Sequence, residues 1–156
     1  MRVAAVDIGT NTARLLVADY REPDLFGGES LEWRDRRVTI TRLGQGVDAT
    51  GTLADDAIGR TVAVLAGYGE AIRAWDVEAV RVVATSATRD AANRDTFLQR
   101  ATLALGTTPE VISGAEEAAL AFRGATAGLP GERPVLVIDL GGGSTEFVQG
   151  TDELGE

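Results

Sequence analysis

Two short segments of the sequence repeat each other 132 positions apart. Residues 6–9 (Val-Asp-Ile-Gly) match residues 138–141 (Ile-Asp-Leu-Gly), and Thr12 aligns with Ser144 at the same offset. Each copy places an Asp at the end of an apolar run, directly before a glycine-rich turn that carries hydroxyl groups. One such segment alone is an ordinary β-turn. Two matching copies predict one fold unit used twice, with a ligand bound between the copies.

The chemistry of these two turns suits an anion such as phosphate. Glycine lets the backbone approach a ligand closely, and successive N–H groups form an anion-binding nest. The hydroxyls add hydrogen-bond donors, and each Asp can hold a cation directly or through water. Asn11 either donates to phosphate or simply suits the turn. The predicted phosphate-binding residues are Gly9, Thr10, Asn11, Thr12, Gly141, Gly142, Gly143, Ser144 and Thr145.

Apolar patterning predicts an α/β fold with a mixed sheet. Residues 3–8 and 13–19 indicate a hairpin whose strands are buried on both faces, and residues 31–43 indicate a third strand. The elements expected next are a helix opened by a capping box at 52–55, a strand at 79–85, a helix at 93–105, a short strand at 111–112, a helix from Ser113 to about Gly128, and a second hairpin at 135–148. A dinucleotide-binding fold would instead begin with a strand–helix unit.

The best linker candidate is the Gly- and Pro-rich stretch 128–134. We therefore expect residues 1–128 to form one complete lobe. Residues 129–156 are expected to be the opening hairpin of a second, truncated lobe. Because unpaired strands invite pairing, we expect this hairpin to pack on the lobe's edge, to pair between chains, or to stay mobile.

Composition limits the chemistry available to the chain. It has no Cys and no His, which excludes thiol nucleophiles, phosphohistidine intermediates and Cys/His zinc sites within it. All 15 basic residues are Arg, so a P-loop lysine is also excluded. Carboxylates, hydroxyls, Arg and backbone amides remain, and these suit hard cations and phosphate. The net charge of −9 argues against nucleic-acid binding, and a polyanionic ligand would need local Arg or metal to offset it.

The hydropathy of the chain points to a cytoplasmic protein without membrane contact. No apolar run approaches the roughly 20 residues that a membrane span requires. Residues 3–6 are too short and too sparsely basic for a signal peptide.

Four segments in order resemble the motifs of one enzyme family. Residues 7–16 resemble the first phosphate motif of the exopolyphosphatase/guanosine-pentaphosphate phosphohydrolase family, and residues 139–146 resemble its second. Residues 85–91 and 112–118 lie between them in the family's order and spacing. The resemblance implies a ribonuclease H-like lobe of the actin, Hsp70 and sugar-kinase superfamily, with three strands followed by alternating helices and strands.

The resemblance also implies a catalytic base. Ser113 and Glu116 have capping-box spacing, so Glu116 is expected to reach back to the Ser113 backbone. Glu117 is then free, and it resembles the general base that activates water in the family. A carboxylate suits this role because the chain offers no His or Cys to accept a proton.

The resemblance further assigns a metal site and phosphate contacts. Asp139 and Glu146 resemble the residues that hold Mg²⁺ in the family, with Mn²⁺ as a substitute, and Asp7 would orient metal-bound water. Arg14 and Arg89 are expected to fork onto phosphate oxygens, with ion pairs to neighbouring carboxylates as the alternative.

The expected function is removal of terminal orthophosphate from inorganic polyphosphate or from a guanosine alarmone, by a full-length protein that is a homodimer. Family members carry a full second lobe, so the 156-residue chain alone is expected to turn over poorly. Two alternatives remain open at this stage. One is a regulatory protein that binds polyphosphate or nucleotide without turnover, and the other is an ATP-dependent kinase of the same superfamily.

Overall fold

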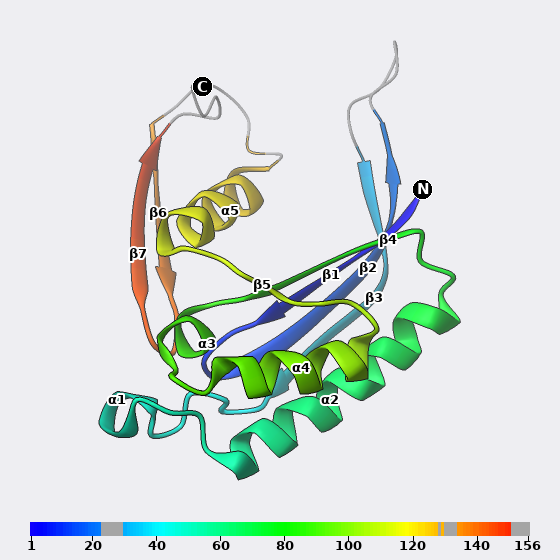
Figure 1. The fold of residues 1–156 in the computed structure, drawn as a ribbon. Coiled ribbons are helices and arrows are strands. Elements are labelled where there is room, and N and C mark those ends of the chain that lie inside the picture. Colours follow the sequence, from blue (N-terminus) through cyan, green and yellow to red (C-terminus); the bar gives the residue numbers. More distant parts are fainter. Residues whose placement is uncertain (23–29, 128, 130–133, 151–156) are drawn as a thin grey trace.

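The computed structural model describes residues 1–22, 30–127, 129 and 134–150, which form seven strands and five helices (Figure 1). The strands are β1 (Arg2–Ile8), β2 (Thr12–Arg21), β3 (Ser30–Ile40), β4 (Ala79–Ala84), β5 (Glu110–Val111), β6 (Val135–Leu140) and β7 (Thr145–Gly150). The helices are α1 (Val47–Thr50), α2 (Asp55–Ala74), α3 (Ser86–Asp90), α4 (Arg94–Leu105) and α5 (Gly114–Thr126).

Five strands form one mixed sheet in the order β3-β2-β1-β4-β5. The first three strands are antiparallel neighbours, whereas β4 runs parallel to β1, and β5 runs parallel to β4. Parallel neighbours require a crossover connection, and α2 and α4 supply these connections. The predicted α/β class and mixed sheet are confirmed. The carboxyl ends of β1 and β4 meet at one edge, where the first glycine turn lies.

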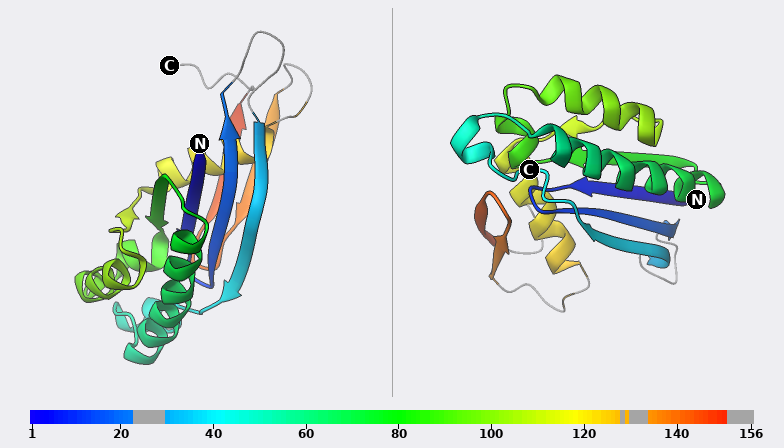
Figure 2. Two further views of the ribbon diagram at one scale, coloured as in Figure 1. Left: turned by 90° about the vertical axis from the view of Figure 1, so that its right-hand side faces the viewer. Right: turned by 90° about the horizontal axis from the view of Figure 1, so that it is seen from below.

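The core lies between the sheet and two helices. Seen from below, α2 and α4 lie side by side over one face of the sheet (Figure 2). Alternate residues of β1 point into this layer, since Ala4, Val6 and Ile8 are all buried. The expectation of strands buried on both faces is wrong, because Ala5 on the opposite face is exposed. Helix α5 stands away from that face and leaves a groove of about 510 Å³.

The start of α2 differs from the predicted capping box. The cap residue is Ala54, and no side chain caps the helix. The Thr52 hydroxyl bonds instead to that of Thr50. Asn93 holds this segment, since its amide accepts from the Leu53 N–H at 2.8 Å and donates to the Leu53 carbonyl at 2.9 Å. Short helices α1 and α3 were not expected, because four or five residues carry no periodic pattern.

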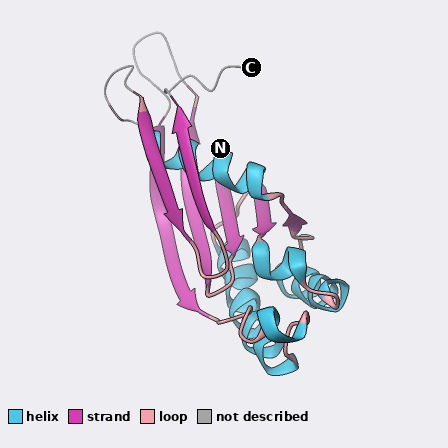
Figure 3. Cartoon of the chain, turned by 90° about the vertical axis from the view of Figure 1, so that its left-hand side faces the viewer, coloured by secondary structure: helices cyan, strands magenta, loops and turns pink. Residues whose placement is uncertain are grey.

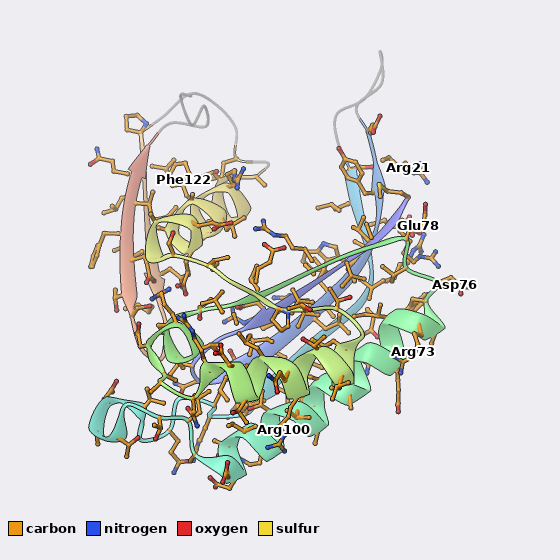
Figure 4. The ribbon with its side chains drawn as sticks, in the orientation of Figure 1. Arg21, Arg73, Asp76, Glu78, Arg100 and Phe122 are labelled. Atoms are coloured by element: carbon orange, nitrogen blue, oxygen red, sulfur yellow. The ribbon has the colours of Figure 1, made fainter. Side chains whose placement is uncertain are left out.

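The second hairpin forms a separate two-stranded sheet of β6 and β7. Figure 3 views it from outside, with its strands in front of the larger sheet. It packs against α5, where Phe122 is buried (Figure 4), and a Cβ atom added at Gly150 would lie 3.0 Å from the Phe122 ring. Its outer face exposes the large apolar side chains Leu136, Ile138, Leu140 and Phe147. The boundary predicted at residue 128 lies outside the described residues.

Candidate functional site

The two glycine turns have the same local geometry. The Gly9 N–H donates to the Thr12 carbonyl at 2.9 Å, and the Gly141 N–H donates to the Ser144 carbonyl at the same distance. The equivalent register positions differ in charge. In the first hairpin Asp7 lies opposite Arg14, whereas in the second hairpin Asp139 lies opposite Glu146.

A third segment joins these turns at the carboxyl end of β4. The Thr85 N–H donates to the Ile8 carbonyl at 3.2 Å, which continues the parallel pairing of β1 and β4 beyond the strand. This brings Ser86 beside the first turn, where its Oγ lies 2.9 Å from the Thr10 Oγ1. Hydroxyl groups from two segments of the first lobe therefore meet at one point.

Both turns open into one polar cavity of about 260 Å³. The predicted site residues that line it are Asp7, Gly9, Thr10, Asn11, Thr12, Arg14, Glu117, Asp139, Gly141, Gly142 and Ser144. The structure thus brings together both glycine turns, the predicted base, the predicted metal ligand Asp139, and Asp7, which was expected to orient metal-bound water. Arg21, Asp76 and Glu78, by contrast, lie at the far end of the sheet (Figure 4).

Four predicted residues do not line this cavity. Gly143 lines an adjoining hollow of about 90 Å³. Thr145 is exposed on the hairpin opposite Leu140. Glu146 lies across the hairpin from Asp139, and Arg89 lies behind Glu117.

The contact between the two turns is unusually close. A Cβ atom on Gly142 would lie 2.4 Å from the Asn11 Nδ2, and one on Gly143 would lie 2.7 Å from the Thr10 Oγ1. Only residues without a Cβ allow this approach. The glycines of the second turn therefore permit contact between the turns, in addition to any role toward a ligand.

Helix α5 begins at the site and separates two adjacent carboxylates. The Ser113 Oγ accepts from the Glu116 N–H at 3.2 Å, as predicted for the cap. The reciprocal bond of a capping box is replaced, because the Glu116 Oε1 accepts from the Arg81 Nη2 at 2.8 Å. Glu117 points to the cavity, and 17% of its side chain is exposed.

The two arginines predicted to bind phosphate are placed differently. Arg14 lines the cavity and lies 3.6 Å from Asp7. The Arg89 Nη1 donates to the Ile112 carbonyl at 3.0 Å and to the Glu117 Oε2 at 3.4 Å. Arg89 thus forms an ion pair with a neighbouring carboxylate, which orients Glu117, and a contact from Arg89 to phosphate stays a prediction.

Two carboxylates of the cavity, Glu117 and Asp7, have raised pKa values, chiefly because they are partly buried. Burial raises the pKa of Glu117, and the charge of Glu146 raises it further, while the bond from Arg89 lowers it. Burial also raises the pKa of Asp7, with the charge of Arg14 opposing and that of Asp139 adding to the effect. A carboxylate with a raised pKa is a better proton acceptor than one with an ordinary pKa.

The raised pKa of Glu117 makes a prediction about stability. Because the folded state holds this proton to higher pH than the unfolded state, stability is lost as pH rises from the ordinary value of 4.5 through the raised folded pKa. A Gln at position 117 does not ionise, so the Glu117→Gln variant does not lose stability in this way. We expect the variant to gain unfolding free energy over the wild type as pH rises through that window, measured by urea denaturation. A difference that is the same at every pH would contradict the assignment.

The carboxylates of the second hairpin are placed where a divalent cation would relieve repulsion between them. Like charges directly opposite on a hairpin are destabilising, and Asp139 and Glu146 occupy such positions. A bound cation would offset this repulsion. In the described part of the chain, no group of three acidic side chains is arranged to hold a metal ion. Mg²⁺ is commonly held by only one or two carboxylates, with waters and substrate phosphates completing the coordination. The residues present therefore fit Mg²⁺.

Sequence reasoning missed Thr85 and Ser86 as cavity residues. Their position in the sequence could have identified them as candidate site residues. Both follow strand β4, whose carboxyl end lies at the same edge as that of β1. Polar residues at adjacent carboxyl ends of parallel strands commonly face a ligand site.

The sequence matches the model of the Ppx/GppA phosphatase family over residues 28–154. The chain belongs to this family. It is 50% identical to exopolyphosphatase 2 of Mycobacterium tuberculosis, in an alignment that covers 98% of this chain and 49% of the relative. The chain thus spans about half the length of the curated relatives it matches.

Solved structures of the Ppx/GppA family show the same fold, that of the actin-like ATPase superfamily. A family member from Aquifex aeolicus is 38% identical, with a TM-score of 0.83 over all of this chain and 49% of that one. An exopolyphosphatase from Cytophaga hutchinsonii is 29% identical, with a TM-score of 0.88 over 97% of this chain and 47% of that one. The predicted family and superfamily are confirmed.

Among the described residues, no helix is both long enough and apolar enough to cross a bilayer.

Proposed function

We propose that the protein hydrolyses phosphoanhydride bonds and releases terminal orthophosphate from inorganic polyphosphate or guanosine pentaphosphate. One observation carries the proposal. The Glu117 carboxylate lines the same cavity as both glycine turns. A proton acceptor therefore faces the place where backbone amides and hydroxyls can hold phosphate oxygens. Membership in the Ppx/GppA phosphatase family supports the same chemistry.

The cavity residues would have different roles in the reaction. The turn amides, with the hydroxyls of Thr10 and Ser144, would bind the phosphate oxygens, and Arg14 would add charge. Glu117 would accept a proton from water as the water oxygen bonds to the terminal phosphorus. The anhydride bond opposite then breaks, and the shortened chain leaves with the bridging oxygen. Arg89 would hold Glu117 in position.

Asp139 and Glu146 would hold Mg²⁺, or Mn²⁺ in its place. When bound, the ion would offset the charge of the phosphate oxygens in the transition state. The positions of these carboxylates opposite each other on the second hairpin support this assignment.

The decisive experiment measures orthophosphate release by the full-length protein from long-chain polyphosphate and from guanosine pentaphosphate, side by side. We expect release with Mg²⁺ and none with excess EDTA. The more rapidly hydrolysed compound identifies the substrate class. Binding of either compound without release would leave a regulatory binding protein as the better description.

Residues 1–156 alone are expected to release orthophosphate far more slowly than the full-length protein. Hairpin β6–β7 pairs with no other described strand, and its outer face exposes Leu136, Ile138 and Phe147. A further strand beside the hairpin would cover this face and hold Asp139 and Glu146 more firmly. Equal rates per active site for the two proteins would contradict this expectation.

A further inference from the structure

We propose that Ser86 is a positioning residue, which turns the Thr10 hydroxyl toward a phosphate oxygen in the cavity. The inference rests on the proposed function only in taking phosphate as the ligand. Ser86 is 5% exposed, and its Oγ lies 2.9 Å from the Thr10 Oγ1. The two residues are separated by 76 positions in the sequence.

The hydroxyl of Ser86 does not cap its own helix, α3. The cap residue of α3 is Thr85, and no side chain caps this helix. The hydrogen bond that the Ser86 Oγ does form crosses to the first glycine turn. A purely local role at the start of α3 therefore does not account for where this side chain points.

The Thr10–Ser86 pair lies at the junction of the two turns. Both residues line the main cavity and also the adjoining hollow. A Cβ atom on Gly143 would lie 2.8 Å from the Ser86 Oγ, so the second turn rests directly on the pair. Behind it, the Gly44 N–H donates to the Thr10 carbonyl at 2.9 Å and holds the Thr10 backbone.

Hydrogen-bond counting and exposure together favour one direction for the pair, because either hydroxyl can donate within it and Thr10 is the more exposed of the two. Each hydroxyl has one donor hydrogen and can also accept. Phosphate oxygens accept only, so a bound phosphate needs a hydroxyl hydrogen directed at it. If Ser86 donates to Thr10, the Thr10 hydrogen is free to donate to phosphate. This chain of two hydroxyls polarises the second donor and strengthens its bond to an anion.

The test combines Ser86→Ala, Thr10→Val and the double variant in the full-length protein. The affinity for inorganic tripolyphosphate is measured by calorimetry, and kcat and KM are measured by orthophosphate release. Ser86→Ala is expected to raise Kd and KM up to about tenfold, near the upper end of the range for a hydrogen bond between neutral groups. Its kcat should stay within about threefold, because ground-state and transition-state binding weaken together. The double variant should lose little more than Thr10→Val alone, since the residues act as a pair.

Thr88→Val is the matched control. Thr88 lies on the same short helix and is fully buried, and its hydroxyl has no hydrogen-bond partner among the described residues. Removal of the Thr88 hydroxyl should leave the Kd for tripolyphosphate unchanged. A Ser86→Ala protein with wild-type Kd and KM would overturn the proposal, as would effects of the two single changes that simply add.

The outcomes separate this inference from the proposed function. A wild-type protein that binds tripolyphosphate without hydrolysing it would refute the hydrolase assignment. The Kd values of the variants would still decide the role of Ser86. A wild-type protein that does not bind tripolyphosphate would overturn both.

Discussion

Glu117→Gln is expected to lower kcat for orthophosphate release by about 10²- to 10⁴-fold, the usual contribution of a general base. Gln keeps the size of the side chain and can still accept from Arg89, but it cannot take a proton from water. The Glu117 carboxylate accepts a hydrogen bond from Arg89, which fixes its orientation. Burial beside the cavity raises the pKa of the same carboxylate. Binding of tripolyphosphate should change little, since the glycine turns are untouched.

The neighbouring residue supplies the control for this experiment. Glu116→Gln changes the same charge one position away, at a carboxylate that contacts Arg81 and does not line the cavity. We expect its kcat to stay within about twofold of the wild type. If Glu117→Gln retained a comparable rate, another group would have to accept the proton, and the catalytic assignment of Glu117 would fail.

Gly69→Ala is expected to destabilise the fold by about 2 kcal/mol or more, although alanine usually stabilises a helix interior. Gly69 is buried in α2 where this helix crosses α4. A Cβ atom there would lie 2.5 Å from the Ala104 carbonyl oxygen and 3.3 Å from the Leu105 Cα. Both are backbone atoms, so relief requires the helices to separate. The melting temperature should fall by about 4 °C or more.

The same helix provides controls for Gly69. Added Cβ atoms on Gly59 and Gly67 would meet nothing within 4 Å. Alanine at either position should therefore raise the unfolding free energy by about 0.5–1 kcal/mol through helix propensity. Urea denaturation of the three variants makes the comparison. A Gly69→Ala protein as stable as Gly67→Ala would show that α2 and α4 are not in close contact in solution.

Much of the fold could be predicted from the sequence because its signals are local. Apolar runs and glycine turns predicted both hairpins, and the Ser113 cap predicted the start of α5. The capping box predicted at the start of α2 was wrong, because no side chain caps this helix. There, contact with Asn93, 40 positions away, holds the segment that Thr52 was expected to cap. The burial of the first hairpin was overestimated because the sequence does not show that helices cover only one face.

The candidate site, like the fold, was predicted only in part from the sequence. The repeated Asp-Gly turns and a carboxylate on the helix from Ser113 were visible in the sequence, and the structure places Asp7, Glu117 and Asp139 around one cavity. Whether Arg89 contacts a phosphate or a carboxylate was left open. The ion pair with Glu117 follows from where α3 and α5 meet.

The sequence by itself determined the two matching turns, the order of the strands and the three longer helices, and the family. These depend on short-range patterns of apolar residues, glycines and caps, which each segment carries with it. Only the tertiary structure decided which of three glycines in α2 must lack a side chain, and that Glu116 accepts a hydrogen bond from Arg81. It also decided that Ser86 meets Thr10. The physical reason is that close approach and hydrogen bonding act between atoms brought together from distant parts of the chain, and no local pattern records those neighbours.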